Sequence, residues 1–363
     1  MGAYILSRPR SAFALVLLFA ILSSAILSGA SNAKSSPSEV VTLASGQLKP
    51  HGIVIFDEYV YWTDAGKGTV SRVPVEGGAV MVLASGGSQP EGIAVDQDYV
   101  YWTDFEAGIV SKVHVTGGPS TILASQQNRP WSILVTGGYV YWAEFLVGNI
   151  KRIPVNGGQV EYVVKDRSGV SGMAIYQGYV YWAEGSIQGA DVSQIGRIPL
   201  ADGARTQLVK TVKPWSITIG ANSLFWTRYR WGGVQKVSLS GGPIKVVEYD
   251  SIEDDDFMIA SDDRNLYWTE RRSGNIKSAP LTGGNVTILA SDQQEPYAIA
   301  TDGTHVVWTE ASGGNVKLYD LPLEGTAWEP AELYTQAVVG SVVIAAIVFV
   351  GVFAVRRRRR RIR

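Results

Sequence analysis

The sequence predicts an all-β fold made of seven copies of one four-stranded unit, and three observations support this. A tryptophan recurs at intervals of 40, 40, 40, 44, 42 and 40 residues, at Trp62, Trp102, Trp142, Trp182, Trp226, Trp268 and Trp308. A period of this length is typical of repeat architectures. Each unit holds four short runs rich in Val, Ile, Tyr and Trp, separated by Asp and Gly turns. No helical periodicity occurs between residues 40 and 325.

The unit at residues 90–125 reads PEGIAVDQDYVYWTDFEAGIVSKVHVTGGPSTILAS, which gives four strands and three turns in order. One such sheet has more apolar surface than it can bury alone, and a radial ring of sheets buries each face against a neighbour. We therefore expect a seven-bladed β-propeller over residues 39–325. The alternative is a ring of six blades, with the first or last tryptophan strand outside it.

The ring needs one strand to close its last blade. The first run, EVVTLASG at residues 39–46, matches the fourth strand AVMVLASG at residues 79–86. We expect it to pair with the run at residues 315–323, which would remove two exposed strand edges. In the competing closure, residues 327–334 supply this strand; Pro330 argues against that, because proline donates no ladder hydrogen bond.

The tryptophan strands carry a specific motif. It reads YVYWTD at residues 59–64 and 99–104, YVYWAE at 139–144 and 179–184, and then LFWTR, LYWTE and VVWTE. These strands resemble YWTD repeats of the low-density-lipoprotein-receptor class B type. The sequence departs from that family, because the later copies lose Tyr or Asp, no Cys-rich module flanks the ring, and the usual ring has six blades. The resemblance implies the propeller fold, and the absence of cysteine makes the chain look more like an exported microbial propeller than an endocytic receptor.

Two apolar segments bracket the repeats. Residues 12–27 follow Arg8 and Arg10 and precede small residues, so we expect residues 1–33 to be a signal peptide and 34–38 a linker. An uncleaved signal anchor is the alternative. Residues 337–355 are uncharged and long enough for a transmembrane helix. Residues 326–336 would be a stalk, and the arginine-rich tail at 356–363 would stay in the cytoplasm. The sequence thus predicts a single-pass membrane protein with an extracytoplasmic propeller.

Composition excludes several kinds of chemistry. The chain has no cysteine, which rules out disulfides and thiolate sites, and it has only three histidines. Without the nine arginines of the two termini, 23 basic residues face 33 acidic ones. A body of this charge repels phosphate backbones, so we expect no nucleic-acid partner.

The two faces of the predicted ring differ in sequence. We call loop face the one that carries the connections from fourth to first strand and from second to third strand, and turn face the opposite one. The turn face has short uniform turns of the type VTGG. On the loop face, the residue just before each innermost strand varies between blades, in the order His51, Glu91, Trp131, Ser171, Trp215, Phe257 and Tyr297.

Loops between second and third strands add further candidates, and blade four carries an extension at residues 185–196. These loop residues are Phe105, Glu106, Phe145, Leu146, Tyr229, Arg230, Trp231, Arg271 and Arg272. Aromatic and arginine side chains on exposed loops are typical of binding surfaces. We therefore expect a protein segment or glycan to bind there. In the alternative interpretation, these aromatic residues cap the central channel.

The sequence gives little support for an enzyme. The innermost strands are small and apolar, and no catalytic motif or metal cluster converges on the axis. The acids that end most second strands, among them Asp64 and Glu144, are expected to satisfy backbone groups rather than a metal. We predict no cofactor and no metal. A structural envelope protein and a propeller-type lyase or hydrolase are the alternative functions.

Overall fold

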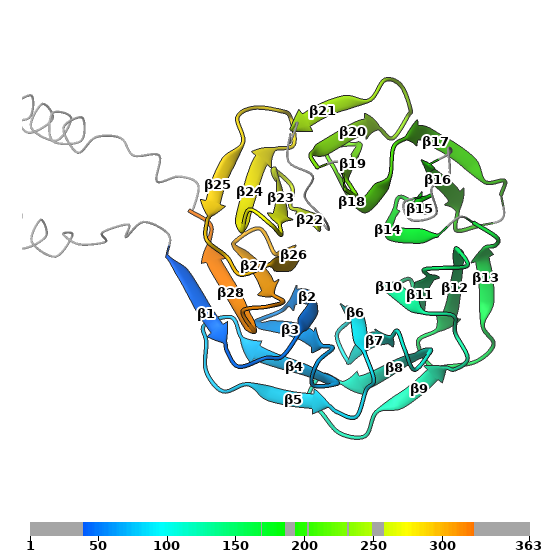
Figure 1. Ribbon diagram of the computed structural model, residues 1–363. Coiled ribbons are helices and arrows are strands. Elements are labelled where there is room, and N and C mark those ends of the chain that lie inside the picture. The colour runs from blue at the N-terminus through cyan, green and yellow to red at the C-terminus, as the bar shows by residue number, and fades with distance from the viewer. Residues whose placement is uncertain are drawn as a thin grey trace, which may run out of the picture. The chain divides into compact units, whose positions relative to one another are not determined.

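The structure is a computed structural model that describes residues 39–322, apart from 168, 186–192, 202, 231 and 249–257. The described residues form seven antiparallel sheets of four strands, arranged as blades around a central axis (Figure 1). The prediction of seven blades is confirmed, and the six-blade alternative is wrong. The expected signal peptide, linker, stalk, transmembrane helix and basic tail lie outside the described residues.

Each of the first four blades is a meander that runs from the axis outward. Blade 1 comprises β2 (Pro50–Phe56), β3 (Tyr59–Asp64), β4 (Thr69–Pro74) and β5 (Met81–Ala84). Blade 2 comprises β6 (Pro90–Val95), β7 (Tyr99–Asp104), β8 (Ile109–His114) and β9 (Thr121–Ala124). Blade 3 comprises β10 (Pro130–Thr136), β11 (Tyr139–Glu144), β12 (Asn149–Pro154) and β13 (Glu161–Val164). Blade 4 comprises β14 (Val170–Tyr176), β15 (Tyr179–Glu184), β16 (Ser193–Pro199) and β17 (Thr206–Thr211).

The remaining three blades follow the same order, except that the last one borrows a strand. Blade 5 comprises β18 (Pro214–Gly220), β19 (Ser223–Arg228), β20 (Val234–Ser238) and β21 (Lys245–Glu248). Blade 6 comprises β22 (Ile259–Ser261), β23 (Asn265–Glu270), β24 (Asn275–Pro280) and β25 (Thr287–Ala290). Blade 7 comprises β26 (Pro296–Thr301), β27 (His305–Glu310) and β28 (Asn315–Asp320), with β1 (Val40–Ala44) as its outermost strand.

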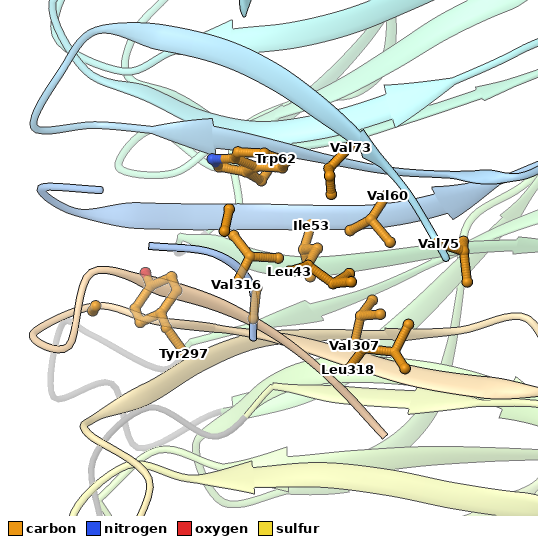
Figure 2. Packing of buried hydrophobic residues seen from close by; sticks show 13 residues of the cluster. Leu43, Ile53, Val60, Trp62, Val73, Val75, Tyr297, Val307, Val316 and Leu318 are labelled. Carbon is orange, nitrogen blue, oxygen red and sulfur yellow. The ribbon is translucent and has the colours of Figure 1, made fainter. Parts of the chain in front are cut away.

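Strand β1 closes the ring as the sequence predicts. Val41 pairs with Leu318 and Thr42 with Lys317, whose Nζ donates a hydrogen bond of 2.9 Å to Thr42 Oγ1. Leu43 is buried in the core between blades 7 and 1, which Figure 2 shows together with Trp62 and Val307. The first and last strands that the structure describes are thereby joined, and the competing closure by residues 327–334 is wrong.

The tryptophans form the packing core of the ring. In every blade the tryptophan lies opposite an aliphatic residue of the innermost strand, as Trp142 lies opposite Ile133 and Trp182 opposite Met173. Six of the seven are at most 1% exposed, and Trp102 is 6% exposed. Truncation of a buried side chain of this size lowers the free energy of unfolding by about 3 kcal/mol or more. Each blade therefore depends on the tryptophan at this position.

The threonine of the YWTD motif joins neighbouring blades. Thr63 Oγ1 donates to the backbone oxygen of Glu91 in blade 2 at 2.7 Å and accepts the backbone N–H of Gly52 at 2.9 Å. Thr309 Oγ1 donates in the same way to the oxygen of His51, across the closure between blades 7 and 1. The motif therefore holds the innermost strands in a fixed register around the axis.

Within the described residues, no helix is long and apolar enough to cross a membrane.

Candidate functional site

The candidate residues of the innermost strands meet at the loop-face end of the central channel. Six of them follow the first residue of their strand, which is proline in blades 1, 2, 3, 5 and 7 and Val170 in blade 4. The sequence suggested exposed side chains, but Trp215 is only 6% and Tyr297 only 9% exposed, and Trp131 is half-buried. The reason is geometric: equivalent positions converge on the axis, so each side chain covers its neighbours.

One half of the channel mouth is polar. His51 Nδ1 lies 2.5 Å from Glu91 Oε2, and both side chains are at least 95% buried. Gln89 Nε2 donates to the other carboxylate oxygen of Glu91 at 2.5 Å. The imidazole also stacks on the ring of Tyr297, with centroids 4.4 Å apart. These four residues, which we call the polar cluster, hold a fixed carboxylate and imidazole beside the channel.

The other half of the mouth is aromatic. Trp131 contacts Phe105, Phe145 and Trp215, with ring centroids 5.8, 5.3 and 6.2 Å apart. Tyr229 stacks on Trp215 at 4.9 Å. We call these five residues the aromatic cluster. They come from blades 2, 3 and 5, and the two tryptophans meet because blade 4 places the small Ser171 between them. Edge and stacked contacts of this kind hold the rings in defined orientations.

Arginines flank the aromatic cluster at both ends. The guanidinium of Arg129 lies 5.2 Å from the ring centre of Phe105, and that of Arg230 lies 5.2 Å from the ring centre of Tyr229. Further round the rim, Arg271 forms an ion pair of 3.0 Å with Glu295. Arg272 is exposed beside it. The rim of the site is therefore charged, while its centre is apolar.

A cavity of about 170 Å³ lies in the channel beneath these clusters. Glu91, Trp131, Ser171 and Tyr297 reach it from the mouth. Its wall is aliphatic, with isoleucines from six innermost strands and Met173 from the seventh. A bound group could therefore meet both the hydrogen-bonding side chains of Glu91 and Ser171 and the apolar side chains of this wall.

The acids at the ends of the second strands contact loop backbone and neighbouring side chains. Asp64 accepts backbone N–H groups from residues 48, 49, 66 and 67 at 2.9 to 3.0 Å. Glu144 accepts from Asn128 N–H and forms a buried ion pair of 2.7 Å with Lys151. Among the described residues, no three metal-ligating side chains lie together. These acids tie loops to blades, as the sequence suggested.

The sequence indicates His51 and Glu91 as separate candidates, whereas the structure pairs them. The available signal was their spacing: they occupy the same repeat position 40 residues apart, so they belong to adjacent blades and face each other across one blade boundary. Two further candidates, Trp231 and Phe257, lie outside the described residues, as do residues 186–192 of the blade-four extension.

Sequence comparison confirms the resemblance to YWTD repeats. The family model of the low-density lipoprotein receptor repeat class B matches residues 58–97. This stretch contains β3, β4, β5 and β6, so the sequence repeat takes three strands from one blade and the innermost strand from the next. No curated protein matches the sequence.

Solved structures share the fold at low identity. Virginiamycin B lyase from Staphylococcus aureus is 17% identical, with a TM-score of 0.66, and the match covers 78% of this chain and 99% of that one. A streptogramin B lyase is 15% identical, with a TM-score of 0.67 and coverage of 78% and 97%. The propeller of a nidogen/laminin complex is 18% identical, with a TM-score of 0.51 and coverage of 67% and 97%. The likeness extends to the fold alone, because both catalytic and binding proteins share it.

Proposed function

Because the chain is a seven-bladed propeller that carries a class B repeat of the low-density lipoprotein receptor type, we propose that it is a non-enzymatic binding module of the cell surface. Its ligand, a protein segment or a glycan, binds on the loop face. The observation that carries this proposal is the aromatic cluster, which gathers side chains of three blades at one half of the channel mouth.

The shape of the cluster supports binding rather than simple closure of the channel. Trp131, Phe105 and Phe145 remain partly exposed although they pack on one another. Aromatic anchors that are held rigidly lose little entropy on binding, and arginines at the rim add polar contacts. An apolar or ring-shaped group of the ligand would lie on Trp131, with its polar groups toward Arg129 or the polar cluster.

Truncation of Trp131 tests the proposal. We would screen the full chain against a glycan array and a displayed peptide library, and then measure the affinity of the hits for Trp131→Ala. Loss of a central aromatic anchor costs about 2 kcal/mol or more, so binding should weaken at least tenfold. Trp215 is a poorer choice because it is buried, and its truncation would also destabilise blade 5.

Tyr139 provides the matched control. It is a half-buried aromatic residue of the same blade, but it lies at the turn-face end of β11 and packs against Tyr141 and Arg152. Tyr139→Ala should leave binding unchanged. If Trp131→Ala binds normally and loses more stability than Tyr139→Ala, the aromatic cluster is a cap and the proposal is wrong.

We also propose that the loop face points away from the membrane. The support comes from ring closure: Val40 lies opposite Tyr319 at the turn-face end of blade 7, and Leu321 N–H donates to the oxygen of Thr304 in a turn of that face. Both ends of the described chain therefore reach the turn face. A C-terminal membrane helix would then place this face toward the lipid.

Fluorescence transfer to a lipid dye tests this orientation. The chain has no cysteine, so single variants Glu76→Cys on the turn face and Glu106→Cys on the loop face can each carry a donor. Both residues are exposed. We expect stronger transfer from position 76. Stronger transfer from position 106 would reverse the orientation, and no transfer from either would argue against membrane attachment.

The polar cluster favours a lyase-type activity as a second candidate. A carboxylate that orients an imidazole is the arrangement used by a general base. The His51–Glu91 pair has this geometry next to the channel cavity, and some propellers of this fold are named as lyases of virginiamycin B. Incubation of the chain with virginiamycin B, followed by mass spectrometry, tests this. A product that His51→Ala fails to form would favour the lyase over the binding module.

A further inference from the structure

The tryptophan of blade 2 is less covered than the other six. Trp102 is 6% exposed, whereas the equivalent residues are 0 or 1% exposed. A cavity of about 130 Å³ opens beside it, between blades 1 and 2 and away from the channel mouth. Its lining includes Gly87, Asp104, Ser111 and Ile122.

The first cause of this cavity is a missing glutamine. Gln47 and Gln293 lie beside the tryptophans of blades 1 and 7, and their Oε1 atoms accept the indole N–H at 3.4 and 3.2 Å. The backbone N–H of Gln47 donates to Gly314, as that of Gly87 donates to Gly68. Gly87 thus occupies the glutamine position in blade 2.

The second cause is a missing lysine. Lys151 and Lys277 lie directly opposite the tryptophans of blades 3 and 6 in the strand register. In blade 2 the residue opposite Trp102 is Ser111. Blade 1 also has a serine here, Ser71, but Gln47 covers its tryptophan. Blades 4 and 5 also have no lysine at this position, because Gly196 and Gln235 lie opposite Trp182 and Trp226, but both tryptophans are fully buried.

The indole N–H of Trp102 is left without a partner. Among the described residues it donates no hydrogen bond, although the side chain is more than nine-tenths buried. In blades 1 and 7 the equivalent N–H points at the glutamine carbonyl, and the space of that carbonyl in blade 2 is the cavity beside Gly87. The indole nitrogens of Trp142 and Trp226 also lack partners, but these side chains are fully enclosed.

We propose that this cavity binds the acetamido group of an N-acetylated sugar. The group presents an amide carbonyl on a short apolar stem, which is what the glutamine side chain presents in blades 1 and 7. The cavity is slightly smaller than one that holds benzene, which is of the order of 150 Å³. An acetamido group fits this space, and a whole sugar ring would remain at the opening.

The lining calls for a neutral group. Asp104 is the only charged residue in it, and its oxygens already accept backbone N–H groups of Ser88, Gln89 and Ala107 at 2.7 to 3.1 Å. The carboxylate of Asp104 is thus already held by backbone donors, and the rest of the lining is uncharged. The exposed Ser85 and Ser120 at the opening offer hydroxyls to a sugar ring, and Ile122, 60% exposed, offers an apolar contact.

Fluorine NMR of the full chain labelled with 5-fluorotryptophan tests this site. Titration with N-acetylglucosamine should shift one signal, which is absent from the spectrum of Trp102→Phe. Glucose, which lacks the acetamido group, should not shift it. Acetamide alone should shift the same signal more weakly. If N-acetylglucosamine shifts no Trp102 signal, or glucose shifts it equally, the proposal is wrong.

Filling the cavity provides the decisive variant. Gly87→Gln restores the glutamine of blade 1 and should abolish the shift. A Cβ there would lie 2.9 Å from Asp104 Oδ2, so the carboxylate must move slightly. If that variant fails to fold, Ser111→Lys fills the cavity from the other side, and Ser71→Lys in blade 1 is its matched control, with binding retained. A shift that persists in a folded Gly87→Gln or Ser111→Lys variant would overturn the proposal. Trp131→Ala leaves this cavity intact, so the result of the cavity test does not depend on whether the loop face binds a ligand.

Discussion

Three residues that precede proline on the loop face adopt left-handed backbone. Their φ angles are 49° for Arg129, 43° for Lys213 and 52° for Glu295. Non-glycine residues seldom adopt this region, and a following proline restricts the backbone further, so each costs about 1 kcal/mol or more. In blade 4 the position is occupied by Gly169, with φ of 69°. The loop face thus stores strain where it displays charged side chains.

We predict that Arg129→Gly is more stable than Arg129→Ala by about 1 kcal/mol, although alanine is normally the better residue for stability. Both variants remove the contact with Phe105, so the difference reports the backbone alone. Denaturant unfolding of the two variants measures it. Equal stabilities, or a more stable alanine variant, would show that this position carries no strain.

The buried pair of Glu270 and Lys277 links stability to pH. Burial alone would raise the pKa of Glu270, but hydrogen bonds from Lys277, Ser273 and Asn275 outweigh it and hold the pKa below its ordinary value. Burial likewise opposes the charge of Lys277, and hydrogen bonds to Glu248 and Glu270 raise its pKa above the ordinary value. Both groups are therefore more strongly charged in the folded state than in the unfolded chain.

The sign of the pH dependence follows from these two directions. The contribution of Glu270 is complete above the unfolded pKa of about 4.3 and is lost as pH falls through the lower folded pKa. That of Lys277 is complete below about 10.4 and is lost as pH rises through the higher folded pKa. We predict that Glu270→Gln costs about 3 kcal/mol at neutral pH and flattens the acid limb of the stability curve. Urea unfolding across acid pH measures this, with the exposed Glu161→Gln as control; an unchanged acid limb would refute it.

At the scale of the blade, the hydrogen bond that joins neighbouring innermost strands comes from two different side-chain positions. In blades 1, 2, 6 and 7 the motif threonine donates to the backbone oxygen of the next innermost strand. Blade 4 has Ala183 instead of threonine, and Ser171 takes over this bond, with its Oγ 2.9 Å from the oxygen of Trp215. The equivalent buried carbonyl is therefore satisfied either by the threonine of the second strand or by a serine of the innermost strand.

We predict that Ser171→Ala destabilises the chain by about 1 to 2 kcal/mol, because the buried oxygen of Trp215 loses its donor. The double variant Ser171→Ala with Ala183→Thr should recover most of this loss, since it restores the arrangement of blade 1. Thermal unfolding of the single and double variants forms a double-mutant cycle. Additive effects, without recovery, would contradict the exchange of roles.

At the scale of the whole molecule, stability depends on the contact between the two ends of the propeller. Strand β1 pairs with β28 and supplies Leu43 and Ala44 to the core between blades 7 and 1 (Figure 2). Without β1, the edge of β28 would be open to other chains. Loss of the pairing between β1 and β28 would therefore destabilise the entire ring.

We predict that removal of residues 1–46 lowers the free energy of unfolding by about 3 kcal/mol or more and promotes association through β28. Removal of residues 1–38 should have no such effect, because β1 is retained. Calorimetry and light scattering measure the two consequences. A peptide of residues 39–46 should restore stability in part, and equal behaviour of the two truncated chains would contradict this role of β1.

The periodicity of the sequence alone determined the fold, because each blade repeats the same burial pattern. The seven copies are similar enough in sequence to be aligned with one another. The tryptophan spacing gave the blade count, and the match of residues 39–46 to a fourth strand gave the closure, since both depend on short-range pattern. The sequence also placed the variable residues on one face, because strand direction alternates within each blade.

The contacts within that face were decided by the tertiary structure. Whether His51 meets Glu91, or Trp131 meets Trp215 over Ser171, depends on how side chains from different blades share the space at the axis. The cavity at Trp102 likewise arises from two small residues that lie 24 positions apart and become neighbours only across a blade boundary. Repeat spacing indicates which positions are equivalent, but packing between blades decides which side chains touch and which remain open to a ligand.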